Sequence, residues 1–299
     1  MKSVRVGCVK YLNARPLIRG WPGDVEFDHP SALCHRLAKG ELDVALVSSF
    51  EFLRNPIYRI VDGVSISSDG PVYSVVVAHV GDISHIKEIE LDPASETAVN
   101  LLRCLLAELG LKPRLIQNKE LQSVRPAGLQ PAAATHSQPA ESGKAENISA
   151  GRTDKISMFQ LPQLAQLLIG DQAMRFRHDH ADAYQFWDLG EQWKELTGLP
   201  FVYALWLIRP EVAEATSIAQ QLRKLRDENL ADIPGIVSDA VGDVSDNKQA
   251  ITKNLLDCYY NEHLRFGFGA REKKGLRTFA DLCAKHGVLP KTISDFSLV

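Results

Sequence analysis

Short apolar runs alternate with amphipathic segments over the first ninety residues of the chain. The apolar run at residues 4–9 predicts a buried strand, and residues 32–39 have helical spacing after Ser31, a residue suited to an N-cap. Residues 42–47 and the β-branched run 73–80 predict two further strands. This alternation indicates parallel strands with crossover helices, so we expect an α/β fold.

The pattern is interrupted in the middle of the chain. Residues 86–91 predict another strand and residues 98–109 a helix, but residues 123–155 hold seventeen Ala, Ser, Pro or Gly, three large aliphatics and no aromatic residue. Such a segment cannot bury enough surface to offset its ordering entropy. We interpret it as a disordered insertion, with folding on a partner as the alternative. The strand pattern resumes at residues 167–171.

The chain becomes almost wholly helical after the aromatic strand expected at residues 202–208, whose alternation favours core packing over a cleft. The expected helices are residues 211–228, 233–241, 248–264 and 272–286. This order suits two lobes with the chain crossing between them. We expect lobe 1 at residues 1–88 plus 204–299 and lobe 2, with the insertion, at residues 89–203.

Composition narrows the class of protein. The 299 residues are 45% hydrophobic, but no apolar stretch at the N-terminus suits a secretory signal and no run approaches a membrane span, so we expect a cytoplasmic protein. A net charge of −3 with dispersed basic residues gives no footprint for nucleic acid. The five cysteines form no Cys-x-x-Cys pair, which argues against disulfides and a zinc site and favours core thiols.

Several polar residues stand where strands end and helices begin. Asn13 follows the first strand, and ligands of open α/β sheets bind outside the strand carboxyl ends, although Asn also caps turns. Ser95 and Thr97 flank a helix start, which favours an anion such as a carboxylate, although simple N-capping needs no ligand. Gly170 permits close backbone approach, and Asp171 either binds a ligand or caps the next helix.

Other patterns are less specific. Ser74 either presents its hydroxyl to a cleft or is an ordinary strand residue. His178 and His180 supply only two of the usual metal ligands in a polar stretch, so we expect no metal site. The chain lacks Gly-x-Gly-x-x-Gly, Gly-x-x-x-x-Gly-Lys-[Ser/Thr] and Gly-x-Ser-x-Gly, so neither nucleotide chemistry nor a nucleophile elbow is indicated.

Seven stretches, taken in order, resemble the chorismate dehydratase family of the futalosine route to menaquinone. They are residues 6–17, 40–49, 70–75, Asp92 with Ser95 and Thr97, and residues 168–173, 188–193 and 197–206. The resemblance covers almost the whole chain except the insertion. It implies a fold like the type II periplasmic binding proteins, with two α/β lobes, mixed and mainly parallel sheets, and a helical C-terminal part.

The resemblance also implies a reaction. Proteins like these are carbon–oxygen lyases that remove water from chorismate to give 3-[(1-carboxyvinyl)oxy]benzoate without a cofactor, the first step of futalosine-dependent menaquinone biosynthesis. Asn13 and Ser74 match the catalytic positions that face the ring and its departing hydroxyl. The positions expected to bind substrate are Arg15, Ser49, Ser95, Thr97, Gly170, Asp171 and Tyr203. Arg15 is the least defined, since it either holds a carboxylate or points to solvent.

The chain departs from the family pattern in its second half. Ala165-Gln166 replaces the usual Asp-Ala pair, and the insertion has no counterpart in most members. The motifs offer no His, Lys or Glu suited to proton transfer. We therefore expect the enolpyruvyl carboxylate of the substrate to take the proton, while the protein supplies positioning, electrostatic support and water exclusion.

Two other functions stay open. One is a cytoplasmic protein of this fold that binds or senses a small acid without turnover. The other is the related 1,4-dihydroxy-6-naphthoate synthase-type lyase, whose N-terminal Pro-Asn-Asp-type signature is absent here. For each, the expected partner is a small acid, chorismate in the main hypothesis, and neither nucleic acid nor membrane. The sequence leaves the oligomeric state undefined.

Overall fold

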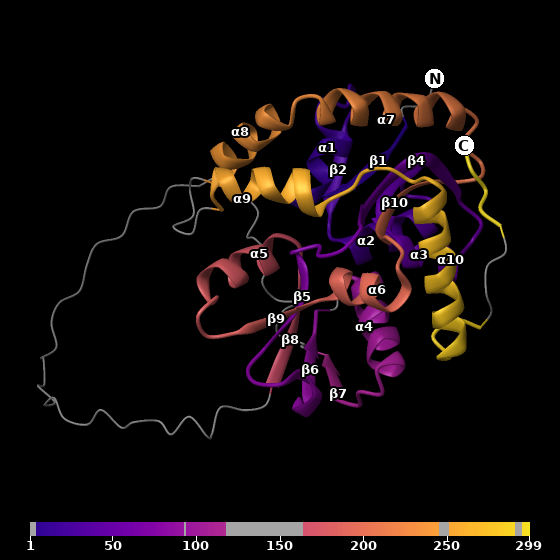
Figure 1. Ribbon diagram of the computed structural model, residues 1–299. Helices are drawn as coiled ribbons and strands as arrows, with labels where there is room; N and C mark the ends of the chain where they lie inside the picture. Colours follow the sequence, from indigo (N-terminus) through magenta and orange to yellow (C-terminus); the bar gives the residue numbers. More distant parts are fainter. Residues whose placement is uncertain (1–3, 93, 118–163, 245–250, 291–294) are drawn as a thin grey trace, which may run out of the picture. The chain divides into compact units, whose positions relative to one another are not determined.

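Two five-stranded sheets form the framework of the computed structural model, which describes residues 4–92, 94–117, 164–244, 251–290 and 295–299 (Figure 1). These described residues all belong to one structural unit, residues 1–118 and 163–299. The expected insertion at residues 123–155 lies outside the described residues.

The first sheet has the strand order β2-β1-β3-β10-β4. Its strands are β1 (Val6–Val9), β2 (Val25–Asp28), β3 (Val44–Ser48), β4 (Arg59–Ser68) and β10 (Phe201–Ile208). Strand β10 is antiparallel to β3 and β4, so the other four strands share one direction. Every residue of β1 and β3 is buried, which explains why both read as continuous apolar runs.

The second sheet repeats this plan with the order β7-β6-β8-β5-β9. Its strands are β5 (Val75–His79), β6 (Glu88–Leu91), β7 (Arg114–Gln117), β8 (Leu164–Ile169) and β9 (Gln185–Asp188). Here β5 is the strand that runs antiparallel to its neighbours, β8 and β9. Ala165 and Gln166 lie inside β8 and pair with β6, so the departure from the family pattern leaves this strand continuous.

The chain changes sheet between β4 and β5 and again between α6 and β10. The first crossing is therefore at residues 69–74, whereas the expected lobe boundary at residue 88 assigned β5 to the first lobe. An apolar β-branched run fits either sheet, and only its long-range pairing with β8 and β9 decides between them. The second crossing precedes Phe201, close to the boundary expected at residue 204.

Helices connect the strands, and the larger C-terminal helices pack on the first sheet: α7 contacts α1 and β4, and α10 contacts β10 (Figure 1). The α-helices are α1 (Arg15–Ile18), α2 (Pro30–Ala38), α3 (Ser49–Arg54), α4 (Glu96–Glu108), α5 (Gly170–Asp179), α6 (Leu189–Thr197), α7 (Ala215–Leu230), α8 (Ile233–Val244), α9 (Lys253–Cys258) and α10 (Ala270–Lys285). The 3-10 helices are η1 (Leu12–Ala14) and η2 (Ile83–His85). The N-cap of α2 is His29 rather than the expected Ser31, because Pro30 suits the first helical position.

The prediction of one continuous α-helix at residues 248–264 is wrong. Helix α9 covers only Lys253–Cys258 and continues as a wider π-helical turn, η3 (Tyr259–His263). Such turns alter which side chains share a helix face. In this turn Tyr259 and Tyr260 are both buried.

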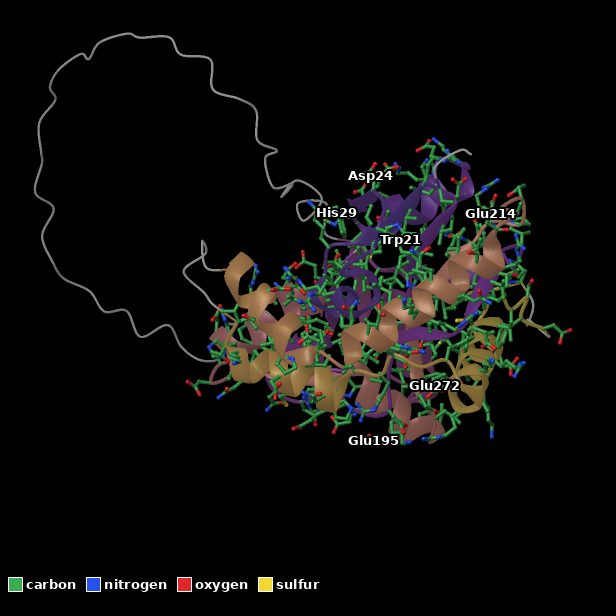
Figure 2. The ribbon with its side chains drawn as sticks, turned by 90° about the horizontal axis from the view of Figure 1, so that it is seen from above. Trp21, Asp24, His29, Glu195, Glu214 and Glu272 are labelled. Carbon is green, nitrogen blue, oxygen red and sulfur yellow. The ribbon has the colours of Figure 1, made fainter. Side chains whose placement is uncertain are left out.

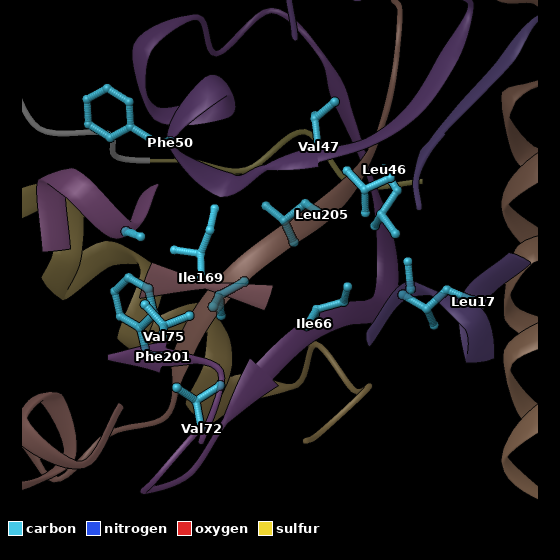
Figure 3. Close-up of a cluster of buried hydrophobic side chains, with 14 of the residues drawn as sticks. Leu17, Leu46, Val47, Phe50, Ile66, Val72, Val75, Ile169, Phe201 and Leu205 are labelled. Carbon is cyan, nitrogen blue, oxygen red and sulfur yellow. The ribbon is translucent and has the colours of Figure 1, made fainter. Parts of the chain in front are cut away.

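A continuous hydrophobic core joins the elements around the two sheets. Figure 3 shows part of it, where Leu46 of β3, Ile66 of β4, Leu205 of β10 and Ile169 of β8 lie together. The aromatic strand β10 buries Phe201 and Trp206 in the core, whereas Tyr203 of the same strand is only partly buried. Among the cysteines, Cys8, Cys34, Cys104 and Cys283 are buried, as expected for core thiols, and Cys258 is of intermediate burial.

Charged side chains cover the exterior; Asp24, Glu195 and Glu214 are exposed examples (Figure 2). The helices within the described ranges include none that is both long and apolar enough to cross a membrane.

Candidate functional site

A cavity lies where strands of both sheets end at their carboxyl termini. Its lining includes Val9 at the end of β1, Ser48 at the end of β3 and Ile169 at the end of β8. The other polar lining residues are Tyr11, Asn13, Ser74, Ser95 and Tyr203. This is the position that open α/β sheets give to ligands.

The cavity collects helix starts and carries no charged lining residue among the described parts of the chain. Ser95 is the N-cap of α4, and Gly170 is the first residue of α5. Unpaired backbone N–H groups and the helix dipole make such starts favourable for anions. The cavity therefore suits an anionic ligand held by N–H and hydroxyl groups rather than by basic side chains.

Asn13 and Ser74 are linked through a third residue, Tyr259. The buried Tyr259 hydroxyl donates a 2.7 Å hydrogen bond to Ser74 Oγ. The Asn13 side chain also bonds to this hydroxyl and lowers the pKa of Tyr259, although burial raises that pKa more strongly. The amide oxygen of Asn13 is buried, and no described group bonds to it.

The backbone just before Ser74 is held in an uncommon conformation. Tyr73 has a positive φ of 68°, which is rare for a residue other than glycine. The Asp188 carboxylate accepts hydrogen bonds from the N–H groups of Val72 at 3.0 Å and Tyr73 at 2.7 Å. The guanidinium of Arg177 lies over the Tyr73 ring, 4.2 Å from its centre. These contacts fix the direction in which Ser74 leaves the turn.

Gly170 lies against the ring of Tyr11. Its φ of +58° is in the left-handed region, and a Cβ at this position would lie 3.3 Å from the Tyr11 ring. The Gly170 N–H donates to the Ser74 carbonyl at 2.7 Å. A glycine here therefore lets α5 begin directly at the cavity wall.

Asp171 is hydrogen-bonded to the turn that contains Asn13. Its Oδ1 accepts a 3.0 Å hydrogen bond from the Leu12 N–H. Burial raises the pKa of Asp171 to about 6, while the Leu12 N–H and the charges of Arg175 and Arg15 lower it. Asp171 does not belong to the residues that line the cavity.

Arg15 lies beside the site rather than in it. It lines a neighbouring hollow that shares Val9 and Tyr11 with the cavity. Its charge lowers the pKa of Asp171 and of Tyr260, so it acts on the groups that hold the Asn13 turn.

Ser49 and Thr97 come together but bond to protein. Ser49 Oγ donates to the Val202 carbonyl at 2.7 Å. Thr97 Oγ1 accepts from the Phe50 N–H at 3.1 Å and contacts the Ser48 hydroxyl. Both side chains are buried and neither lines the cavity. The neighbouring residues Ser48 and Ser95 line it instead.

Tyr203 lines the cavity from β10. Its hydroxyl lies 3.1 Å from Ser68 Oγ, which donates to the Gly70 carbonyl at 2.9 Å. Burial and the nearby Asp188 carboxylate raise the pKa of Tyr203. Gly190 fits closely here, because a Cβ would lie 2.7 Å from the Tyr203 hydroxyl. The hydrogen bond to Ser68 and the close approach of Gly190 limit the positions open to the Tyr203 hydroxyl.

Sequence reasoning missed Tyr259, Tyr11, Ser48 and Asp188 as site residues. Tyr11 and Ser48 lie inside stretches that carry the family resemblance, so that signal was available. Tyr259 had no local signal, because its contact with Ser74 spans 185 residues of sequence. In the polar stretch with His178 and His180, the His180 ring packs against the protein: it stacks on Phe176 with ring centres 4.3 Å apart.

Comparisons with known proteins agree on both family and fold. The model of a family described as menaquinone biosynthesis matches residues 4–135 and 146–285. A chorismate dehydratase from Thermus thermophilus is 26% identical, with 94% of this chain and 95% of the relative covered.

Solved structures show the periplasmic-binding-protein fold. The alkanesulfonate-binding protein SsuA from Xanthomonas axonopodis has a TM-score of 0.63 at 16% identity, over 96% of this chain and 94% of the other. Protein AF1704 from Archaeoglobus fulgidus gives 0.61 at 14% identity, over 96% and 98%. SsuA from Escherichia coli gives 0.59 at 12% identity, over 97% and 89%. The expected fold class, with two mixed sheets and a helical C-terminal part, is confirmed.

Proposed function

Because this chain belongs to the menaquinone biosynthesis family, we propose that it dehydrates chorismate to 3-[(1-carboxyvinyl)oxy]benzoate and water. This is a carbon–oxygen lyase reaction and the first step of futalosine-dependent menaquinone biosynthesis. The relative that bears the name chorismate dehydratase matches along nearly its full length, which supports a shared activity. The cavity supports it chemically, because it joins an unpaired amide oxygen and a serine hydroxyl to two helix starts.

The reaction breaks two bonds on neighbouring ring carbons. The carbon that bears the enolpyruvyl ether loses a proton, and the adjacent carbon loses hydroxide with the electron pair of the C–O bond. The electrons of the C–H bond form the new ring double bond, and proton and hydroxide together make the water. The product ring is aromatic, which supplies the driving force.

The enolpyruvyl carboxylate of the substrate itself takes the proton and then gives it to the departing hydroxide, which leaves as water. The described lining residues include no carboxylate, histidine or lysine that could serve as base. Asp171 is a motif carboxylate next to the lining residue Gly170, but it accepts from the Leu12 N–H and lies outside the lining. Since substrate provides both base and leaving group, the scheme assigns no step to a cofactor.

The protein residues position the substrate and stabilise the departing oxygen. Asn13 orients the reacting ring, and Ser74 donates to the leaving hydroxyl. The start of α4 at Ser95 and the start of α5 at Gly170 receive carboxylates, where the helix dipoles favour negative charge. Tyr11 and Tyr203 both line the cavity and supply aromatic surface for the ring of the substrate.

Turnover of chorismate by the purified full-length protein tests the proposal. Mass spectrometry is expected to show a product lighter than chorismate by one water, formed in proportion to enzyme and time. Chorismate that binds but is recovered intact would overturn the proposed activity and indicate a binding or sensing protein of this fold.

A further inference from the structure

Three polar groups, two of which belong to buried residues, form a hydrogen-bonded series at the cavity wall. They are the Asn13 side-chain amide, the Tyr259 hydroxyl and the Ser74 hydroxyl. Tyr259 and Ser74 are each only 1% exposed, so water does not compete for their hydrogen bonds. Tyr259 itself does not line the cavity, and it reaches the site through Ser74.

The hydrogen bonds of this series all run in one direction, from Asn13 to Tyr259 and from Tyr259 to Ser74. The Tyr259 hydroxyl uses its single hydrogen on Ser74 Oγ, at 2.7 Å. Because this hydrogen is already used and Asn13 Oδ1 has no described partner, the contact between Asn13 and the Tyr259 oxygen has the amide N–H as its donor. Ser74 Oγ is therefore an acceptor on its protein side, and its own hydrogen is available to the cavity.

The same arrangement sets the orientation of the Asn13 amide. When its N–H₂ group donates to Tyr259, its oxygen is the atom left without a described partner. The site then presents an acceptor from Asn13 and a donor from Ser74. An alcohol is the group that matches this pair, because its hydroxyl donates and accepts at once.

We propose that Tyr259 is a positioning residue whose hydroxyl directs the Ser74 O–H toward the leaving hydroxyl of the substrate and holds Asn13 with its oxygen facing that same hydroxyl. This inference rests on the proposed function. It adds a residue from the C-terminal π-helical turn to the dehydration site. It also gives a reason for product release, since the aromatic product lacks the hydroxyl that satisfies both groups.

The Tyr259→Phe variant tests this role, because it removes the hydroxyl and keeps the ring that packs beside Tyr260. We expect kcat to fall about tenfold to 100-fold, since a donor that touches the oxyanion is worth about 100-fold or more and Tyr259 acts through one. KM is expected to change less than about threefold, because ground-state contacts remain. Unchanged kcat in the folded variant would overturn the inference.

Tyr58→Phe is the matched control. Tyr58 is also fully buried, and its hydroxyl donates to Glu51 at 3.3 Å away from the cavity lining. We expect both variants to lose similar stability and only Tyr259→Phe to lose turnover. A similar loss of kcat in Tyr58→Phe would reveal a general effect of removing a buried hydroxyl and would contradict a positioning role.

A double-mutant cycle with Ser74→Ala separates positioning from general stability. Because part of the effect of Tyr259 passes through Ser74, Tyr259→Phe is expected to lower kcat by a smaller factor in the Ser74→Ala background than in the wild type. Full additivity of the two losses would overturn the inference. If Tyr259→Phe does not fold, 3-fluorotyrosine at position 259 retains packing and donor; near-wild-type kcat supports the role, and a loss beyond about tenfold contradicts it.

These outcomes are distinct from failure of the proposed function. A wild-type protein that leaves chorismate intact overturns the dehydratase activity together with this inference. A wild-type protein that is active, with an equally active Tyr259→Phe variant, overturns the inference alone.

Discussion

The Asp171 carboxylate accepts a 3.0 Å hydrogen bond from the backbone N–H of Leu12. The carbonyl of Leu12 in turn accepts a 2.7 Å bond from the Tyr260 hydroxyl. Both polar atoms of this residue are thus held by side chains distant in sequence. Since Asn13 follows directly, the position of its amide depends on α5 and on the π-helical turn as much as on its own strand.

The pH dependence of stability follows from Asp171. Burial raises the pKa of Asp171 to about 6, above its ordinary value of 3.8, so the folded state binds this proton more tightly than the unfolded chain. Its contribution to stability is therefore gained as pH falls from about 6 to about 4 and is absent at pH 7. Relative to Asp171→Asn, the wild type is expected to gain up to about 3 kcal/mol over this window.

Urea unfolding of both proteins between about pH 4 and about pH 7 measures this difference. The other titrating groups are common to both proteins and cancel in the comparison. Parallel curves for wild type and Asp171→Asn would show that Asp171 does not have a raised pKa.

The same substitution has a distinct expected effect on turnover. Asp171→Asn keeps an oxygen that can accept from Leu12, so the Asn13 turn stays in place. If Asp171 is not the base, kcat is expected to fall by less than about tenfold. A complete loss of turnover with chorismate binding unchanged would contradict proton transfer to the substrate's own carboxylate.

Gly170 is expected to tolerate no side chain without loss of ligand binding. An alanine there meets the left-handed strain of about 1–2 kcal/mol and places Cβ 3.3 Å from the Tyr11 ring. Gly198→Ala is the control, because its φ of +71° carries the same strain and nothing lies within 4 Å of the added Cβ. Both variants should lose similar stability, and only Gly170→Ala should raise the dissociation constant of chorismate; equal affinities would contradict the role of this wall.

Asp188 is expected to link stability to activity. It is buried and accepts from the N–H groups of Val72, Tyr73, Gly190 and Glu191. Asp188→Ala leaves these donors unpaired and releases Tyr73 from its positive φ, so we expect a loss of about 3 kcal/mol or more and a lower kcat.

The control for this variant is Asp82→Ala. Asp82 caps η2 and accepts from the Ser84 N–H at 2.8 Å at an exposed site. Its loss should lower stability much less than the loss of Asp188 and leave kcat unchanged. Thermal unfolding measures the loss of stability in the two variants, and kcat measures the loss of activity. An Asp188→Ala variant with wild-type kcat would show that the turn does not orient Ser74.

The sequence predicts the buried strands well, because β1, β3 and β10 carry the apolar runs that burial on both faces demands. No strand is predicted from the sequence at β4, where Gly63 and several serines interrupt the apolar residues. The structure accommodates those serines by long-range bonds, such as that from Ser67 Oγ to the Arg265 carbonyl. A local sequence pattern cannot predict such a partner, because Ser67 and Arg265 are far apart in the sequence.

The residues of the candidate site also fall into those that the sequence predicts and those that only the fold reveals. Asn13, Ser74 and Gly170 follow from motifs beside strand ends, and all three line the cavity. Ser49 and Thr97 also belong to those motifs, but their hydroxyls bond to the protein, which spacing along the chain cannot reveal. Tyr259 is found only once the fold brings the C-terminal turn to Ser74.

The kcat of Asn13→Leu with chorismate, compared with that of the wild type, tests the central claim most directly. Leucine matches asparagine in the number and branching of its side-chain heavy atoms. It removes both the amide N–H₂ group and the amide oxygen of Asn13, which has no described partner. We predict water loss from chorismate by the wild type and a fall of about 100-fold or more in kcat for the variant, with the fold intact by circular dichroism. Turnover at the wild-type rate in Asn13→Leu would contradict the account.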